Sequence, residues 1–398
     1  MNRPARGNFL ADYLHATGTS EVPKVFHRWC ALSVLSAVMM DRVWVRKGAS
    51  ILRPNLYIFL IGPSGCGKGE AIATGLRLLK DVPQVAMEYG RTTAAALVDR
   101  LAARASSLRD ASKVFLVTPE LTMAVGRGTQ SDDLIKLMTE LYTGSDVPLV
   151  ERTRTSGRHI VRGHCLNWLA GTTKDWLRDC VTREAVEGGF FARVACVQAN
   201  YGKTRHATPT LPADYEATVR RLQAHIECLL SVEAEVTFHP VAQELHDQWY
   251  HGRPEPEDEI LMPSWRREDD AVRKLAVLLA MAEPDPQPMV LPKHATEAQQ
   301  LVAGLARQLP AIIDFIGAGV DSDLMRRVRR VIQEAKVIQH PVLAQNLARV
   351  GVTSDRLRLC VDTLIEAGIV RRDRSPERGG WTYTWVRRRL QPGGDHAV

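Results

Sequence analysis

The sequence predicts an α/β fold, in which a mainly parallel sheet carries helices on both faces, and two observations indicate it. Apolar stretches typical of buried strands alternate with helical stretches between about residues 56 and 200, which is the pattern of parallel sheets. A glycine-rich loop also joins the first of these strands to a helix. The strands that we expect span residues 56–61, 85–88, 114–118, 166–170 and 193–198.

Helical regions flank this core on both sides. Residues 8–46 carry an apolar face at helical spacing and end near a short expected strand, Val43 to Val45. Residues 213–318 have an almost wholly helical pattern, interrupted by polar and proline-rich loops. The expected domains are a helical N-terminal segment (1–50), the α/β core (51–205), a helical domain (206–320), a small C-terminal domain (321–390) and a disordered tail (391–398).

Composition narrows the class of protein. Hydrophobic residues make up 45% and charged residues 24% of the 398 positions, as in soluble globular proteins. No apolar run reaches the roughly 20 residues that span a bilayer, and no apolar core follows the basic N-terminus, so we expect neither a membrane span nor a secretion signal. The seven cysteines form no C-x-x-C pair, which favours reduced thiols, a cytoplasmic location and no zinc site.

The net charge of +7 is unevenly distributed. Residues 321–398 hold 15 Lys and Arg against 9 Asp and Glu, whereas the rest of the chain is close to balanced. A basic excess confined to one domain indicates a polyanionic partner there.

The glycine-rich loop has the spacing G-x-x-x-x-G-K of a phosphate-binding P-loop. Its backbone N–H groups turn toward a polyphosphate, its lysine reaches the outer phosphates, and the following helix adds partial positive charge. The sequence therefore predicts a P-loop NTPase core that binds ATP with Mg²⁺. The expected nucleotide-binding residues are Gly62, Pro63, Ser64, Gly65, Cys66, Gly67, Lys68, Gly69 and Glu70.

Two positions that normally contact the metal ion differ from the usual pattern. Gly69 stands where a Ser or Thr hydroxyl would hold Mg²⁺. Glu120, which follows the strand 114–118, has the position of a catalytic glutamate that polarises water, but Thr118 or Pro119 replaces the aspartate that usually precedes it. Two interpretations remain: a weakened ATPase, in which water or Glu70 replaces the missing ligands, or a site that binds nucleotide structurally and hydrolyses little.

Two later positions are candidates for the catalytic machinery. Thr172 or Thr173, at the end of the strand 166–170, is placed to orient water near the γ-phosphate, or else both threonines only cap a helix. Arg193 follows Gly188-Gly189 and leads into the last core strand. Such an arginine can reach across a subunit boundary onto a neighbour's phosphates, and the alternative is an ordinary surface arginine.

The C-terminal domain resembles a winged helix. Helices are expected at residues 323–335, 340–349 and 353–366, followed by strands at 369–372 and 381–385. The third helix of such a domain enters the DNA major groove, although a winged helix used for protein contacts is the alternative. The candidate DNA-binding residues are Arg356 and Arg358 on this helix and Arg371, Arg372, Arg374 and Arg378 on the wing.

The order of these motifs resembles the AAA+-type helicase domains of phage and mobile-element replication proteins, in particular their primase-associated helicase-like family. The resemblance covers about residues 8–318 and includes Pro54-Asn55-Leu56, the loop, Glu120, Ala170 to Thr173 and Gly189 to Arg193. It also includes the lead-in from Phe9 to Val45 and the segment Val272 to Ala276. The segment at Arg193 also resembles the arginine-finger strand of minichromosome-maintenance helicases.

The resemblance has four implications. Residues 206–320 form a helical lid, Arg193 acts in trans, and Arg273 senses phosphate from the lid. A basic hairpin before the strand 166–170, with its turn at Ser156-Gly157, would project into the central channel of a ring and grip DNA. Its candidate residues are Arg152, Arg154 and Arg158, and a basic surface hairpin without a ligand is the alternative.

The leading functional hypothesis is an ATP-binding DNA helicase or translocase for phage or mobile-element replication. It would assemble as a homo-oligomer, a hexameric ring, with single-stranded DNA in the channel and duplex DNA at the winged helix. One alternative is a nucleotide-dependent DNA-binding initiator or loader with little or no hydrolysis. Another is a transcriptional regulator whose ATPase domain senses nucleotide.

Overall fold

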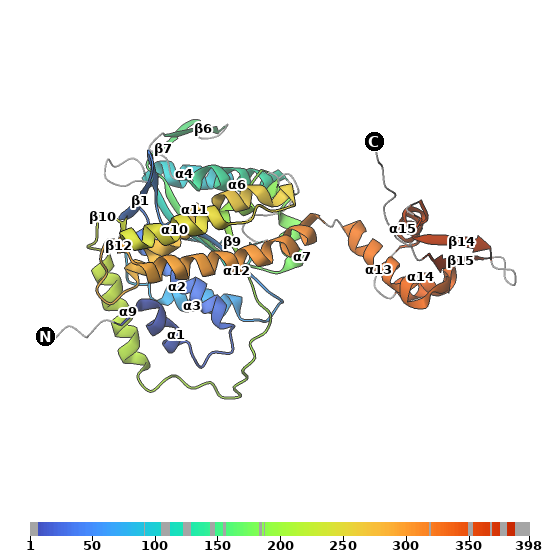
Figure 1. The fold of residues 1–398 in the computed structure, drawn as a ribbon, viewed down its shortest axis with the longest axis horizontal. Helices are drawn as coiled ribbons and strands as arrows, with labels where there is room; N and C mark the ends of the chain where they lie inside the picture. Colours follow the sequence, from blue (N-terminus) through green and yellow to red (C-terminus); the bar gives the residue numbers. More distant parts are fainter. Residues whose placement is uncertain are drawn as a thin grey trace. The chain divides into compact units, whose positions relative to one another are not determined.

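The chain forms two compact units, Met1–Ile316 and Gly317–Val398, which are described separately. Figure 1 shows the elements of each unit in the computed structural model. The residues that the structure describes are 7–90, 92–104, 112–121, 129–143, 148–153, 157–182, 185–186, 188–317, 320–348, 353–366, 368–374 and 380–386.

A five-stranded, all-parallel sheet forms the centre of the first unit, in the order β4-β5-β8-β3-β9. It confirms the predicted α/β class, and all five predicted strands are present with ends shifted by at most two residues. Strands β3 and β8 are buried along their whole length, as expected where helices cover both faces. The five strands are β3 (Tyr57–Ile61), β4 (Met87–Tyr89), β5 (Lys113–Thr118), β8 (Cys165–Thr172) and β9 (Val194–Gln198).

Alternate residues of the sheet face two separate hydrophobic clusters. Ile58 and Leu60 belong to one cluster, with helices α1 (Phe9–Ala16), α2 (Lys24–Met39), α3 (Lys68–Arg77) and α9 (Tyr215–Leu229). Tyr57, Phe59 and Ile61 belong to the other, with α4 (Ala94–Arg104), α6 (Thr129–Leu141) and α7 (Lys174–Cys180). This alternation follows from the two-residue period of a strand.

Helix α12 (Pro292–Gly317) joins the two clusters. Its first half supplies Ala298 and Val302 to the first cluster, and its second half supplies Ile312 and Ile316 to the other. The Gln308 side chain accepts a hydrogen bond of 2.8 Å from the backbone N–H of Gln198 on the edge strand β9. The segments predicted as N-terminal region, core and lid therefore share continuous hydrophobic clusters.

The rest of the helical region consists of α10 (Pro240–Gly252), the short η2 (Glu259–Leu261) and α11 (Met262–Met281). Contrary to the almost wholly helical expectation, short strands interrupt it: β10 (Ala234–Glu235) pairs with β1 (Val43–Lys47), and β11 (Thr237–Phe238) pairs with β12 (Met289–Val290). Strand β1, which contains the predicted strand Val43 to Val45, also forms a hairpin with β2 (Ser50–Leu52).

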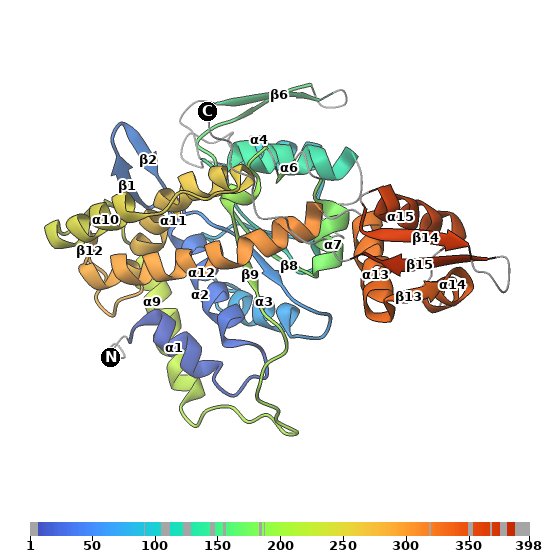
Figure 2. The ribbon, with the colours of Figure 1, turned by 45° about the vertical axis from the view of Figure 1, so that its right-hand side comes forward.

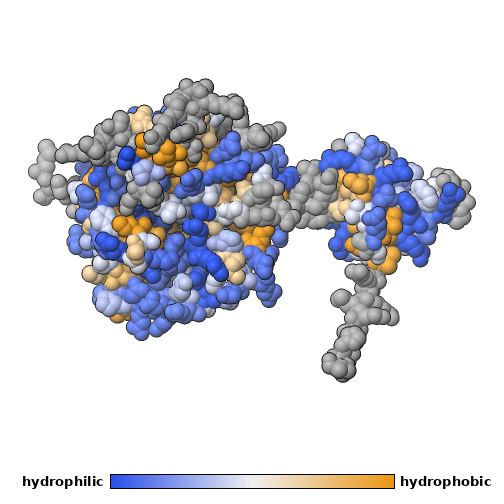
Figure 3. All heavy atoms as spheres, turned by 90° about the horizontal axis from the view of Figure 1, so that it is seen from above, coloured by the Kyte–Doolittle hydropathy of each residue, from blue (hydrophilic) through white to orange (hydrophobic). Residues whose placement is uncertain are grey.

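In its described residues, the second unit contains three helices and a three-stranded sheet. The predicted helices are present as α13 (Val320–Ala335), α14 (His340–Ala348) and α15 (Ser354–Glu366), and the two predicted strands as β14 (Val370–Arg374) and β15 (Trp381–Trp385). A third strand, β13 (Val337–Gln339), pairs with β15 and was not predicted, because three residues carry too short a pattern. Val328, Leu357 and Tyr383 lie in its core, and the visible surface of each unit is mostly hydrophilic (Figure 3).

A buried polar contact fixes β8 against the start of β3. The side-chain oxygen of Asn167 accepts a hydrogen bond of 2.8 Å from the backbone N–H of Leu56, and its Nδ2 donates to the Ser36 carbonyl at 3.2 Å. The Ser36 hydroxyl donates to the Pro54 carbonyl at 2.7 Å. Asn167 is fully buried. If its side chain were removed, water could not replace it as the partner of the Leu56 N–H and the Ser36 carbonyl.

Replacing Asn167 with leucine tests this contact. The Leu56 N–H would then be buried without a partner, and we expect the free energy of unfolding to fall by about 1–3 kcal/mol. Chemical denaturation measures the change. The control Ser231→Ala, at an exposed hydroxyl that donates to the nearby Cys228 carbonyl, should have little effect, and equal values for the two variants would contradict the assignment.

Candidate functional site

The glycine-rich loop lies at the carboxyl end of β3, between β8 and β9. The chain passes from β8 to β9 on the other side of β3, so this is where the order of the strands reverses. In open parallel sheets, ligands bind at the carboxyl ends of strands at such a point. The predicted phosphate loop therefore occupies the position where an α/β protein binds its ligand.

Close contacts with neighbouring segments require the glycines of this loop. A Cβ atom on Gly62 would lie 2.7 Å from the Ala199 carbonyl oxygen, and one on Gly67 would lie 2.5 Å from the Val22 side chain. Gly65 and Gly67 also have positive φ angles of 78° and 84°, which glycine adopts at no steric cost. Helix α3 begins directly after Gly67 without a side-chain cap, so its first N–H groups suit an anion.

Lys68 is folded back over the loop. Its Nζ donates hydrogen bonds of 2.8 Å to the carbonyl oxygens of Gly62 and Pro63 and lies 3.7 Å from Cys66 Sγ. The residue is only 7% exposed. A phosphate oxygen would replace a neutral carbonyl with a charged acceptor, which adds Coulomb attraction to the hydrogen bond of the ammonium. The ammonium group is thus held within the loop, beside the place of the expected phosphates.

The outer part of the loop is accessible. Ser64 and Gly65 are exposed, and the hydroxyl of Tyr201 donates to the Ser64 carbonyl at 3.0 Å. Gly69 and Glu70 are exposed as well, and Glu70 accepts a bond of 3.2 Å from the Ser20 hydroxyl. All nine predicted loop residues therefore lie together at one edge of the sheet.

The residues present suit a polyphosphate better than a metal ion held by the protein. Gly69 supplies no oxygen ligand from its side chain, although a Cβ there would meet nothing within 4 Å. The Thr118 hydroxyl is buried and accepts a hydrogen bond of 2.9 Å from the indole N–H of Trp168. Within the described ranges, no three His, Cys, Asp or Glu residues are grouped as a metal would need.

Glu120 lies at the same edge of the sheet as the loop. It follows β5, which is separated from β3 by β8 alone, so the two strand ends are about 10 Å apart. A Cβ on Gly171 of β8 would lie 2.4 Å from the Pro119 carbonyl oxygen. Pro119, directly after β5, therefore lies against the end of β8, the strand next to β3.

The two threonines at the end of β8 have different surroundings. Thr173 caps α7, since its hydroxyl accepts a bond of 3.2 Å from the Trp176 N–H. Thr172 is buried next to the loop: its carbonyl accepts from the Gly62 N–H at 3.1 Å, and its hydroxyl donates to the Thr173 carbonyl at 3.1 Å. The capping alternative thus describes Thr173, whereas Thr172 lies beside the expected phosphates.

Arg193 lies at the opposite edge of the sheet. It ends the short helix η1 (Phe191–Arg193), and the next residue, Val194, pairs with Tyr57 at the amino end of β3. Its Nη1 donates to the Gly189 carbonyl at 2.8 Å. Burial, followed by the nearby charge of Arg267, lowers its pKa. Arg193 is therefore about five strand residues, or roughly 16 Å, from the loop of its own chain.

Arg193 belongs to a basic hollow that the sequence did not reveal. Arg266 and Arg267 of α11 line this hollow of about 490 Å³ together with Arg193 and Asp270. They come from a helix more than 70 positions further along the chain, so local sequence patterns did not connect them with Arg193.

The structure does not bring Arg273 to the phosphate loop. Its Nε donates to the carboxylate of Asp269 at 3.0 Å, and its guanidinium lies 5.5 Å from the ring centre of Phe238. The next residue, Lys274, donates to Asn55 just before β3, at the edge opposite the loop. Burial alone would raise the pKa of Asp269, but bonds from His246 and Lys47 with the charge of Arg273 hold it well below its usual value.

The predicted basic hairpin is present as β6 (Leu149–Thr153) and β7 (Gly157–Val161), which extend from the body of the first unit (Figures 1 and 2). Arg152 pairs directly with Arg158. Gly157, predicted as part of the turn, belongs to β7 and pairs with Thr153, and Ser156 lies outside the described residues. Arg154 lies outside the described residues.

Most of the predicted DNA-binding arginines of the second unit are exposed. Arg356 and Arg358 are exposed on α15. On β14, Arg372 and Arg374 lie 4.8 and 5.6 Å from the ring centre of Trp381 on β15, which is 41% exposed. Two of the β14 arginines also pair with acidic side chains, namely Arg371 with Asp373 and Arg372 with Asp362. Arg378 lies outside the described residues.

Comparison with known proteins does not assign this chain to a family. No family model matches the chain, and a search of curated proteins finds no match. None of the helices in the described parts of the chain is long and apolar enough to cross a membrane.

Removing the ammonium group of Lys68 tests the phosphate site. We expect Lys68→Ala to weaken binding of ATP by about 10- to 100-fold, the cost of losing one charge-assisted hydrogen bond. Isothermal titration measures this affinity. Lys80→Ala, at an exposed lysine just beyond α3, is the matched control, and an unchanged affinity in Lys68→Ala would contradict the site.

Restoring a hydroxyl at position 69 tests the altered metal contact. Because the position has free space around a Cβ, Gly69→Ser should fold normally and give tighter, Mg²⁺-dependent ATP binding. A gain of about tenfold corresponds to roughly 1.4 kcal/mol. Titrations with Mg²⁺ and with a chelator separate the metal effect, and Gly69→Ala controls for the lost glycine. An equal gain in both variants would exclude metal coordination by the hydroxyl.

Proposed function

We propose that this protein is an ATP-binding DNA helicase or translocase of the AAA+ type, assembled as a ring, for the replication of phage or mobile-element DNA. The single observation that carries the proposal is the arrangement around the sheet. The phosphate loop and Glu120 share one edge, and Arg193 lies at the other.

This arrangement favours a site shared between subunits. An arginine at the amino end of β9 is too far to reach the phosphates on its own loop. Its Nε is buried without a hydrogen-bond partner among the described residues, and such groups usually have one. The neighbour's γ-phosphate would supply a charged acceptor, so that each ring subunit completes the site of the next.

The chemistry assigned to this chain is positioning and proton transfer. Lys68 holds the outer phosphates, and Glu120 accepts a proton from the attacking water. The Arg193 of a neighbouring subunit neutralises charge that develops in the transition state. A Mg²⁺ ion bound with the nucleotide would neutralise further charge, but the Gly69 and Thr118 side chains do not hold it.

The second unit supports an interaction with DNA. It carries most of the basic excess of the chain, and its three helices with a β14–β15 hairpin suit a winged helix that places α15 in the major groove. The side chain of Arg358 is exposed on α15, and Trp381 lies against two arginines on the hairpin. The β6–β7 hairpin is the proposed contact to single-stranded DNA in the ring.

A DNA-binding initiator or loader that hydrolyses little ATP is the second candidate. The observation that favours it is the absence of an oxygen ligand at Gly69 combined with the commitment of the Thr118 hydroxyl to Trp168. In that case the nucleotide would join subunits without driving movement along DNA. Phosphate release in the presence of single-stranded DNA distinguishes the two functions.

Mixing two inactive variants tests the shared site. Glu120→Gln and Arg193→Ala should each reduce DNA-stimulated phosphate release to near background. A mixture of the two should recover activity, because the intact Arg193 of one variant completes the intact Glu120 site of the other. Arg205→Ala, at an exposed arginine, should retain normal activity. Absence of recovery in the mixture would contradict action in trans, and unchanged activity in Glu120→Gln would contradict the enzyme.

Salt dependence tests the role of α15. Removing one phosphate contact should weaken binding to any duplex sequence and lower the slope of log K against log salt by about one. We expect this result for Arg358→Ala in fluorescence anisotropy with a short duplex. Arg330→Ala, at an exposed arginine of α13, should leave the slope as in the wild type. The same slope in Arg358→Ala would remove α15 from the interface.

A further inference from the structure

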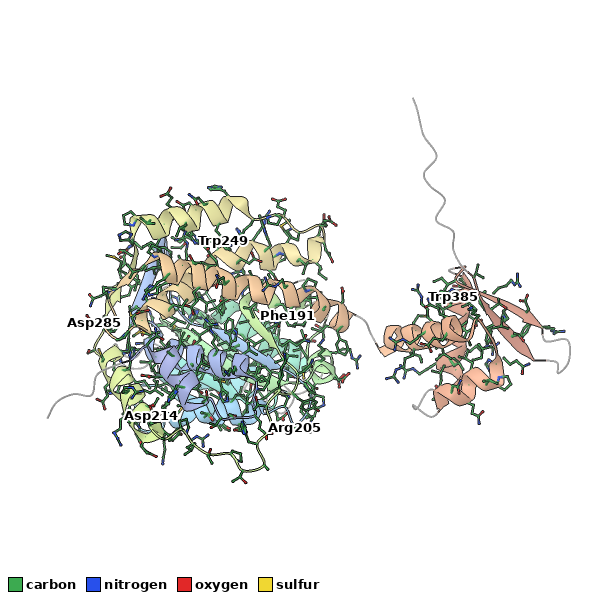
Figure 4. All side chains as sticks on the ribbon, turned by 60° about the horizontal axis from the view of Figure 1, so that its bottom comes forward. Phe191, Arg205, Asp214, Trp249, Asp285 and Trp385 are labelled. Atoms are coloured by element: carbon green, nitrogen blue, oxygen red, sulfur yellow. The ribbon has the colours of Figure 1, made fainter. Side chains whose placement is uncertain are left out.

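A pocket of about 440 Å³ lies beside α3, the helix that follows the phosphate loop. Its walls come from α1, the connection between α1 and α2, one face of α3, and the stretch that leads into α9. Figure 4 labels Arg205 and Asp214, between which this stretch contributes Pro209, Thr210 and Leu211 to the wall. A volume of this size suits a small organic ligand.

Two buried polar side chains in the wall have no hydrogen-bond partner. Tyr13 and His27 are each 1% exposed. Within the part of the chain that the structure describes, the Tyr13 hydroxyl and both ring nitrogens of His27 lack partners. Buried polar groups in proteins are nearly always hydrogen-bonded, and leaving one without a partner costs stability. Both residues border the pocket, and a ligand with polar edges would satisfy these buried atoms once the two rings turn toward it.

The pocket begins at the phosphate loop. Glu70, two positions after Lys68, belongs both to the loop and to the pocket wall. The connection between α1 and α2 lies beside both the loop and the pocket. Its Val22 contacts Gly67, and its Ser20 hydroxyl donates a hydrogen bond to Glu70. From Lys68, the wall continues along α3 to Arg77, about 14 Å away at the helical rise of roughly 1.5 Å per residue. One extended ligand can therefore occupy the loop and the pocket together.

The charges of the pocket favour the uncharged part of such a ligand. The carboxylates of Glu70 and Glu216 and the guanidinium of Arg77 line it. These side chains give the pocket no excess of positive charge for further phosphate groups, whereas the carboxylates can accept hydrogen bonds from sugar hydroxyls. Burial lowers the pKa of His27 to about 4. At neutral pH its imidazole is therefore uncharged, with one donor and one acceptor nitrogen, as the edge of a nucleobase requires.

We propose that the Tyr13–His27 pocket binds the base and sugar of the nucleotide whose phosphates occupy the loop. The Tyr13 hydroxyl and the His27 ring nitrogens contact the hydrogen-bonding edge of the base, and Leu211 and Leu222 provide apolar surface. This inference rests on the proposed nucleotide binding and adds the residues that recognise the base.

A comparison of ATP with inorganic tripolyphosphate tests the pocket separately from the loop. Thr74 lines the pocket, whereas Ala73 is exposed on the same helix and does not. Thr74→Trp fills the pocket and should weaken ATP binding by at least about tenfold, or 1.4 kcal/mol, without changing the affinity for tripolyphosphate. Ala73→Trp, the matched control, should bind both ligands as the wild type does.

Tyr13→Phe provides a milder variant that keeps the ring. Loss of one neutral hydrogen bond should weaken ATP binding by about 2- to 10-fold and leave tripolyphosphate binding unchanged. Isothermal titration gives the affinities, and thermal unfolding confirms that each variant is folded. If ATP binds the wild type no more tightly than tripolyphosphate, or if Thr74→Trp affects both ligands equally, the pocket assignment is wrong although the loop stands. If the wild type binds neither ligand, the proposed function fails as well.

Discussion

The candidate site depends on the close approach of other segments to three glycines at the carboxyl edge of the sheet. Gly62 lies against the segment after β9, Gly67 against the α1–α2 connection, and Gly171 against the segment after β5. Side chains at these positions would separate the three segments. Because glycine has no side chain, the loop, Glu120 and the Tyr13–His27 pocket can lie close together. The proposed site therefore requires glycine at these three positions.

The parallel orientation of the strands explains why the proposed site is shared between subunits. Because all five strands run parallel, the loop at the end of β3 and Arg193 at the start of β9 lie at opposite edges. One chain therefore presents the proposed phosphate-binding groups on one side and a partly buried arginine on the other. Repetition of this polarity from copy to copy suits a closed ring, in which identical contacts join unlike surfaces.

Local patterns predicted much of this arrangement, and long-range contacts account for the remainder. The five strands and the loop have strong signals of their own, and they are where the sequence places them. The pocket and the Arg266–Arg267 hollow combine residues far apart in the chain, so no local pattern marks them. For Arg273, the sequence did contain a signal that it pairs within its own helix. Asp269 lies four positions earlier, which is the spacing of an ion pair along a helix, and the structure contains that pair.

The most direct test of the central claim is a high-resolution structure of the protein with a non-hydrolysable ATP analogue. We predict that the phosphates contact the backbone N–H groups of residues 64–68. We also predict that Lys68 Nζ exchanges the Gly62 and Pro63 carbonyls, to which it now donates at 2.8 Å, for phosphate oxygens. An analogue bound elsewhere, with Lys68 still on these two carbonyls, would contradict the account.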